Sequence, residues 1–101
     1  MGISARVSED GTELNIGIDG RFDFSSHQDF RKAYEDADTA LEKYVVDMNA
    51  TTYLDSSALG MLLLLRDHAG GDHANIRIIN CNDDVKKILT ISNFEQLFEI
   101  H

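Results

Sequence analysis

The residues of this chain best suited to chemistry are two adjacent serines that follow an aspartate, in the segment Asp55 to Gly60 with the sequence DSSALG. This segment follows the apolar stretch Tyr44 to Met48 and precedes the apolar run Met61 to Leu65. That order predicts a strand, a loop and then the start of a helix. A helix start exposes unpaired backbone N–H groups and the positive end of the helix dipole. A serine there is either a helix cap or the acceptor of a phosphate.

Capping is the simpler interpretation, because Asp and Ser are among the preferred N-cap residues. Three features favour a phosphate acceptor. Two hydroxyls, Ser56 and Ser57, are present where one cap is sufficient, and Ala58 and Gly60 keep side-chain bulk low in the first turn. That glycine has a cost of about 1 kcal/mol relative to alanine inside a helix. The apolar run begins only after this turn, so we expect the turn to be exposed and open to another protein's active site.

A phosphate on Ser56 would gain from the helix dipole and from the free N–H groups. It would also bring close to two negative charges beside Asp55, where like charges repel. Such a local change of charge on a docking surface is enough to abolish binding, because like charges brought together across an interface cost several kcal/mol.

The elements that must position this segment follow from the pattern of the remaining residues. A period-2 alternation and a turn at Asp10-Gly11 predict a hairpin, and later segments alternate between helical and strand-like patterns. We expect strands at 5–8, 14–18, 43–48 and 76–79. We expect three helices: one from Ser25 or Ser26 to about Lys43, one from about Ser57 to 68 or 69, and one from a cap at Asn82 or Asp83 to about 91. The tail at 94–100 is either a helical turn or a short strand.

The predicted fold class is therefore α/β, a single domain over residues 1–101 with a mixed sheet of four to five strands and helices packed on it. Right-handed crossovers place the strand-to-helix loops along one edge of such a sheet. Asp23, Asp47 and Ser56 all fall at such loops or at strand ends.

Charge and composition restrict the partners. The formal net charge is −9 and the pI is about 4.6, so binding to nucleic acid or to an anionic membrane is disfavoured and a basic partner surface is the natural complement.

The single cysteine, Cys81, excludes an internal disulfide, and the four histidines show no metal-ligand spacing. We expect no cofactor and no metal. The first residues lead into no apolar signal segment, so a cytoplasmic location is expected. Without an obvious exposed apolar stripe, we expect a monomer.

Three other functions compete with a phosphoserine switch. A hydrolase would need a nucleophile elbow Gly-x-Ser-x-Gly, which is absent around Ser56, and no histidine is placed near it by sequence. In a phosphoaspartate receiver, Asp47 with Asp23 and Asp55 would form an acidic Mg²⁺ pocket, but the only adjacent acidic pair, Asp83-Asp84, comes late and the final segment has no lysine. The third is an interaction module that works without phosphorylation.

Residues 46–49 and 53–60 resemble the signature of the bacterial anti-sigma factor antagonists, the STAS domain family. The resemblance covers essentially the whole chain: Gly20 to Asp23 matches the Gly-x-x-Asp of the family, and Asn93 to Ile100 matches its closing segment. Ala58 stands where most members have glycine, and Asn49 where many have serine.

The resemblance implies that Ser56 is the phospho-acceptor and that Asp23 and Asp55 shape recognition by the kinase and the partner. It implies a non-enzymatic protein whose unphosphorylated form binds an anti-sigma factor and frees a sigma factor. A serine kinase, often the anti-sigma factor itself, switches it off, and a PP2C-type phosphatase restores it. Segments 21–24 and 91–97 look most like antagonists in phosphorelays that govern motility and biofilm formation. The expected partner-binding residues are Asp23, Asp55, Ser57, Ala58, Leu59 and Gly60.

Overall fold

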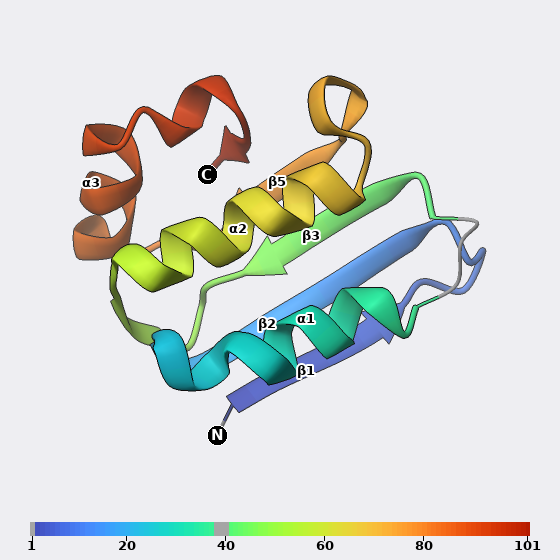
Figure 1. Ribbon diagram of the computed structural model, residues 1–101, viewed down its shortest axis with the longest axis horizontal. Helices are drawn as coiled ribbons and strands as arrows, with labels where there is room; N and C mark the ends of the chain where they lie inside the picture. The colour runs from blue at the N-terminus through green and yellow to red at the C-terminus, as the bar shows by residue number, and fades with distance from the viewer. Residues whose placement is uncertain (1, 38–40) are drawn as a thin grey trace.

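The computed structural model of the chain describes residues 2–37 and 41–101. Within these residues, strands and helices alternate after an N-terminal hairpin (Figure 1). The strands are β1 (Gly2–Val7), β2 (Glu13–Phe22), β3 (Lys43–Asp47), β4 (Thr51–Leu54), β5 (Ile76–Ile79) and β6 (Glu99–Ile100). The α-helices are α1 (His27–Glu35), α2 (Ser56–His68) and α3 (Asp83–Ile91), and the short 3-10 helices are η1 (Phe24–Ser26), η2 (Gly71–His73) and η3 (Phe94–Gln96).

The strands form one mixed sheet in the order β1-β2-β3-β5-β6, with β4 paired to β2 outside this row. β1 runs antiparallel to β2, and the other pairs are parallel. The predicted α/β fold with a mixed sheet is thus confirmed. β4 was not among the predicted strands, and the ambiguous tail contains both a helical turn, η3, and a short strand, β6.

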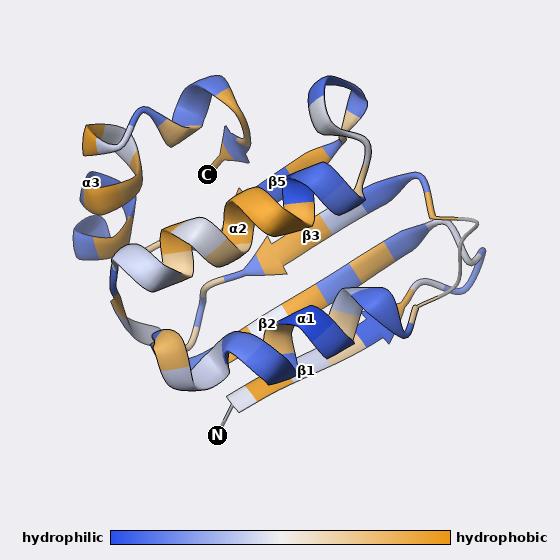
Figure 2. Ribbon diagram, in the orientation of Figure 1, coloured by the Kyte–Doolittle hydropathy of each residue, from blue (hydrophilic) through white to orange (hydrophobic). Residues whose placement is uncertain are grey.

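Helices α1 and α2 lie side by side on one face of the sheet (Figure 1). The alternation along β2 explains why: Leu14, Ile16 and Ile18 are buried, whereas the residues between them are not. These side chains join a core that includes Phe30 of α1 and Leu62 of α2, and Figure 2 shows the apolar bands on β2 and β3 beneath the two helices. Each such side chain stabilises the fold by about 1.5–3 kcal/mol.

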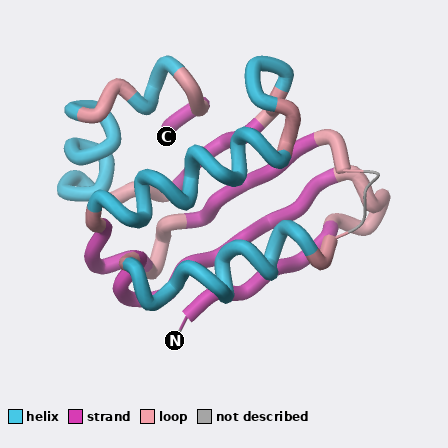
Figure 3. Tube along the Cα trace, in the orientation of Figure 1, coloured by secondary structure: helices cyan, strands magenta, loops and turns pink. Residues whose placement is uncertain are grey.

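The long strand β2 changes its partner along its length. Residues Glu13 to Gly17 pair with β3, and residues Gly20 to Phe22 pair with β4, with a shift of register between Gly20 and Arg21. Gly20 has a φ of 89°, a conformation that glycine adopts without the steric cost of a side chain. The pairing of Phe22 with Leu54 brings the ends of β2 and β4 together, and Figure 3 shows the loops that follow them at the same end of the sheet.

β1 begins three residues before the predicted strand 5–8, and β2 ends four residues after the predicted strand 14–18. Both boundaries of the first helix also differ from the sequence prediction. α1 ends at Glu35 rather than near Lys43, because the chain has to leave the helix layer and enter the sheet where Lys43 pairs with Glu13. Part of the predicted extension, residues 38–40, lies outside the described residues. The start is also different: neither Ser25 nor Ser26 caps α1 with its side chain. Their hydroxyls donate instead to Asp23 and to the Arg21 carbonyl.

Thr51 is a buried polar residue that ties β4 to the sheet. It is 2% exposed, and its hydroxyl donates to the Ile18 carbonyl at 3.0 Å. We predict that Thr51→Val lowers the free energy of unfolding by about 1–3 kcal/mol, because a buried hydrogen bond is lost. Urea unfolding measures the change. The neighbouring exposed Thr52 provides the control: Thr52→Val should change stability by no more than about 0.5 kcal/mol. Equal effects of both changes would contradict a stabilising role of the hydrogen bond from the Thr51 hydroxyl to the Ile18 carbonyl.

Candidate phosphorylation and docking site

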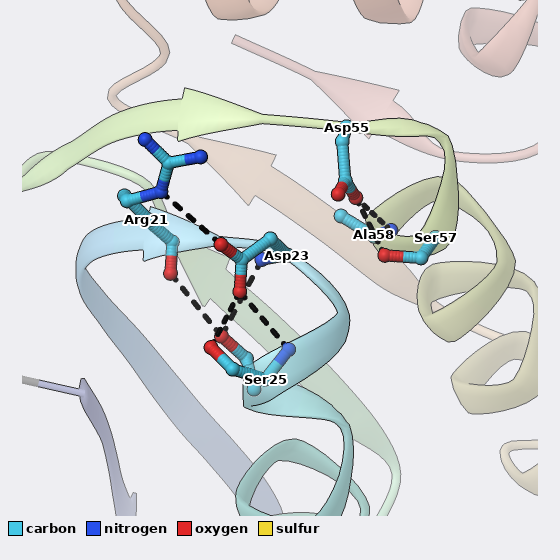
Figure 4. A network of polar contacts seen from close by, with 7 residues as sticks. Arg21, Asp23, Ser25, Asp55, Ser57 and Ala58 are labelled. Atoms are coloured by element: carbon cyan, nitrogen blue, oxygen red, sulfur yellow. Dashed lines mark hydrogen bonds and ion pairs between the residues drawn. The ribbon is translucent and has the colours of Figure 1, made fainter.

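Asp55, not a serine, caps α2. Its backbone is extended, with φ −115° and ψ −177°, and its carboxylate accepts hydrogen bonds from the Ala58 N–H at 3.0 Å and from the Ser57 hydroxyl at 2.6 Å (Figure 4). Such a side chain satisfies one of the backbone donors that every helix start leaves unpaired. Asp55 and Ser57 are therefore committed to the local structure.

Ser56 is the first residue of α2 and is exposed. Its hydroxyl makes no hydrogen bond to any residue that the structure describes. The capping interpretation thus accounts for Asp55 and Ser57 and leaves Ser56 without a structural role. An exposed, uncommitted hydroxyl at the positive end of a helix is suited to accept a phosphate.

A second capping carboxylate, Asp23, lies on the adjacent loop (Figure 4). It accepts from the backbone N–H and the hydroxyl of Ser25, at 3.0 and 2.6 Å, and from Arg21 Nε at 3.1 Å. The Arg21 guanidinium lies 4.3 Å from the centre of the Tyr53 ring, because Arg21 and Tyr53 are opposite each other in the β2–β4 pairing. Asp23 is therefore held in place by Ser25 of its own loop and by Arg21, whose guanidinium stacks on the Tyr53 ring of β4.

The two carboxylates are both favoured in their ionised form. The hydrogen bond from the Ser57 hydroxyl lowers the pKa of Asp55, although the nearby charge of Asp23 acts in the opposite direction. The pKa of Asp23 is lowered first by the Ser25 hydroxyl and then by Arg21. A phosphate on Ser56 would thus enter a surface that already carries two negative charges.

The predicted docking residues take different places in this geometry. Asp23, Asp55 and Ser57 are brought together around the start of α2, and Leu59 is half-buried and packs against the core. Gly60 is exposed, as expected of an open first turn. Ala58 is 0% exposed and belongs to the core, so its small size serves packing in the core, and not access from outside as its spacing suggested. Its contribution to the site is the N–H that holds Asp55.

Several exposed residues around Ser56 were missed by the sequence analysis. Phe24, in η1, is 77% exposed, and Leu63 and Leu64 of α2 are 39% and 48% exposed. These are large apolar side chains on the surface that the pattern of the sequence did not indicate. Arg21 and Tyr53 were missed because only the β2–β4 register brings them together. The signal available for Phe24 was its place next to Asp23, in a segment flanked by polar residues.

The geometry also bears on the competing functions. Asp47, the strand-end carboxylate of the receiver hypothesis, accepts from the Asn49 N–H at 2.9 Å and from Asn80 Nδ2 at 3.1 Å. It is thus used to hold two turns, while Asp23 and Asp55 serve as caps. For the hydrolase hypothesis, within residues 2–37 and 41–101 no histidine nitrogen hydrogen-bonds to Ser56. The same residues include no helix with the length and apolar character that a membrane crossing requires.

The fold is shared with solved structures of anti-sigma factor antagonists. SpoIIAA in its unphosphorylated form matches with a TM-score of 0.72 at 12% identity, over 99% of this chain and 87% of that one. The phosphorylated Bacillus SpoIIAA matches with a TM-score of 0.70 at 12% identity, over 99% and 91%. An anti-sigma factor antagonist from Mycobacterium paratuberculosis matches with a TM-score of 0.75 at 14% identity, over 99% and 86%. At identities this low, the structural similarity shows a common fold and nothing more.

The sequence itself identifies the family. The family described as "Mlab, STAS domain" matches residues 5–99. A STAS-domain containing protein of Pseudomonas aeruginosa (strain UCBPP-PA14) is 64% identical over 100 residues, which are 99% of each chain. The chain belongs to the STAS domain family, as the resemblance of residues 46–60 predicted.

The Ser57 hydroxyl gives a direct test of the site's electrostatics. Because the pKa of Asp55 is lower in the folded than in the unfolded chain, its cap stabilises the fold above the ordinary pKa of 3.8, and this contribution is lost as the pH falls through the lowered value. We predict that Ser57→Ala raises the pKa of Asp55 toward 3.8, as measured by an NMR titration of its carboxyl carbon. The control, Ser25→Ala, should raise the pKa of Asp23 instead. An unchanged Asp55 midpoint in Ser57→Ala would contradict the assignment.

Proposed function

We propose that this chain is an anti-sigma factor antagonist, a non-enzymatic switch protein whose binding is controlled by phosphorylation of Ser56. The observation that carries the proposal is the division of roles at the start of α2. Asp55 caps the helix and Ser57 holds Asp55, whereas Ser56 is exposed and its hydroxyl is uncommitted. A kinase can therefore modify Ser56 without disturbing the cap.

In the unphosphorylated state, the surface around Ser56 binds an anti-sigma factor and frees the sigma factor. Asp23, Asp55, Ser57, Leu59 and Gly60 belong to this surface, together with the backbone of Ala58. The chain's net charge of −9 favours a partner with basic groups at the contact. A serine kinase, which is the anti-sigma factor itself or a separate protein, inactivates the switch, and a PP2C-type phosphatase reactivates it.

Phosphorylation acts by local charge in this mechanism. A phosphate adds close to two negative charges beside the carboxylates of Asp23 and Asp55, and a partner that complements two carboxylates then meets an excess of negative charge. No refolding is required. The similarity of the fold to both the unphosphorylated and the phosphorylated forms of SpoIIAA supports this view.

The proposal extends to the setting in which the switch works. We place the protein in the cytoplasm as a monomer, in a phosphorelay that governs motility or biofilm formation. The setting is supported by the resemblance of segments 21–24 and 91–97 to antagonists of such pathways.

Variants at Ser56 test the switch. We predict that Ser56→Ala binds one of the host's purified anti-sigma factors constitutively in isothermal titration calorimetry. Ser56→Asp should bind the same protein at least about 30-fold more weakly, equivalent to about 2 kcal/mol.

Thr90→Asp is the matched control, because it adds the same charge at an exposed position of α3; it should bind like the wild type. Equal affinity of Ser56→Ala and Ser56→Asp would favour an interaction module that works without phosphorylation.

A further inference from the structure

β1 is the outermost strand of the sheet and lies on the far side of α1 from α2 (Figure 1). It pairs with β2 along one edge, and within residues 2–37 and 41–101 no strand pairs with its other edge. A strand at the edge of a sheet exposes backbone donors and acceptors with which another chain can pair. The open edge of β1 is therefore a place where a further strand can join the sheet.

The register of the hairpin shows which peptide groups of β1 face outward. Ser8 donates to the Glu13 carbonyl at 2.8 Å, and the pairing continues along the whole of β1 in one register. Antiparallel strands alternate between hydrogen-bonded and non-hydrogen-bonded pairs, so every second residue back from Ser8 is bonded to β2. The N–H and C=O groups of the residues between them point away from β2. These residues are Ile3, Ala5 and Val7.

The same three residues form the floor of a groove between β1 and α1. Alternate side chains of a strand share one face, and α1 covers this face incompletely: Ile3 packs against the core, whereas Ala5 and Val7 are exposed. The groove has a volume of about 530 Å³. On the helix side it is bordered by Asp29, Lys32, Ala33, Asp36 and Ala37. We call it the β1 groove.

The β1 groove continues toward the loop of Asp23. A second depression of about 330 Å³ adjoins it, and the two share Ile3 and Asp29. This second part is bordered by the end of β2 and by the segment that leads into α1, including Asp19, Arg21, Asp23, Ser25 and Ser26. A chain that follows β1 is thus led to the side of Asp23, which belongs to the proposed docking surface around Ser56.

The charges along the groove indicate the chemistry of its occupant. Its borders carry four carboxylates and two cations: Asp19, Asp23, Asp29, Asp36, Arg21 and Lys32. Arg21 is already paired with Asp23. A second copy of this chain would bring the same acidic borders together, which is unfavourable. The complement is an extended segment whose alternate apolar side chains meet the floor and whose lysine or arginine side chains meet the borders.

We propose that the β1 groove binds an extended segment of a partner protein, which joins the sheet as a strand beside β1. The backbone of the segment pairs with the outward N–H and C=O groups of Ile3, Ala5 and Val7, in the manner of β-strand addition. Apolar side chains of the segment cover Ala5 and Val7, and basic side chains face Asp29 and Asp36. Binding there does not require the phosphorylation switch, because the groove and α2 lie on opposite sides of α1.

Photocrosslinking in living host cells identifies the segment. The crosslinker p-benzoylphenylalanine replaces Val7, which is 39% exposed in the groove, in one strain and Arg6 in the control strain. Arg6 is also exposed, but its side chain points to the opposite face of β1. We expect position 7, but not position 6, to crosslink to a peptide that has apolar residues at alternate positions and lysine or arginine among them.

Amide hydrogen exchange distinguishes strand addition from other contacts. In the free protein, the outward N–H of Ala5 should exchange faster than the N–H groups of Ser4 and Arg6, which are bonded to β2. A synthetic peptide of the crosslinked segment, added at about ten times its Kd, should slow the exchange at Ala5 about ten-fold.

The acidic border is tested with the same peptide in isothermal titration calorimetry. The double variant Asp29→Asn, Asp36→Asn should bind it at least about five-fold more weakly, because two attractions to basic side chains are lost. Asp83→Asn, Asp84→Asn is the matched control, since it removes the same charge from exposed positions of α3. It should bind like the wild type.

The contrary outcomes are equally definite. A crosslink from position 7 to a second copy of the chain or to an acidic segment would overturn the proposal, as would the same product from positions 6 and 7. The absence of any product at position 7 would also overturn it. So would a peptide that leaves the exchange at Ala5 unchanged, or that binds the two double variants equally.

Discussion

The site depends on the parallel pairing of the end of β2 with β4. β2 pairs with β3 over its first half and with β4 from Gly20 to Phe22, with a shift of register between Gly20 and Arg21. Phe22 and Leu54 then lie opposite each other in the core, and the residue that follows each of them is a capping aspartate. Two separate loops are thereby brought to one place, and α2, whose first residue Ser56 is exposed, begins there.

This arrangement gives neighbouring residues different roles. Asp55 and Ser57 stabilise the first turn of α2, and Asp23 together with Ser25 and Arg21 stabilises the adjacent loop. Because each carboxylate is held by donors of its own loop, the negative charges keep fixed positions. Ser56 contributes nothing to these contacts, and so it can change its charge while the scaffold stays the same. A fixed scaffold with one modifiable group is what a switch based on local charge requires.

The parts of the site that could be predicted are those that depend on local sequence. The strand, loop and helix around Asp55 to Gly60 follow from an apolar run, a capping residue and a helical run, and the family resemblance is carried by the same segment. β4 escaped prediction because its sequence, TTYL, shows neither a period-2 alternation nor an apolar run, so that only its pairing with β2 defines it. The proximity of Arg21 to Tyr53 depends on a non-local register that no pattern along the chain encodes.

Exposure was harder to predict than position. Leu63 and Leu64 are apolar residues, and apolar residues are buried more often than not, so no pattern along the chain indicated that they lie on the surface. Conversely, Ala58 was expected at the surface for its small size, whereas it is enclosed by the core. In both cases the decisive factor is the rotation of an element about its axis. The end of α1 was missed for a related reason, since the need to reach the sheet at Lys43 overrides the helical pattern.

The central claim is that Ser56 accepts and releases a phosphate. The most direct measurement is the intact mass and the phosphopeptide map of the protein purified from its native host, with and without treatment by a PP2C-type phosphatase. We expect an acid-stable phosphate on Ser56 that the phosphatase removes. An acid-labile phosphate on an aspartate, or the absence of phosphate under every growth condition, would contradict it.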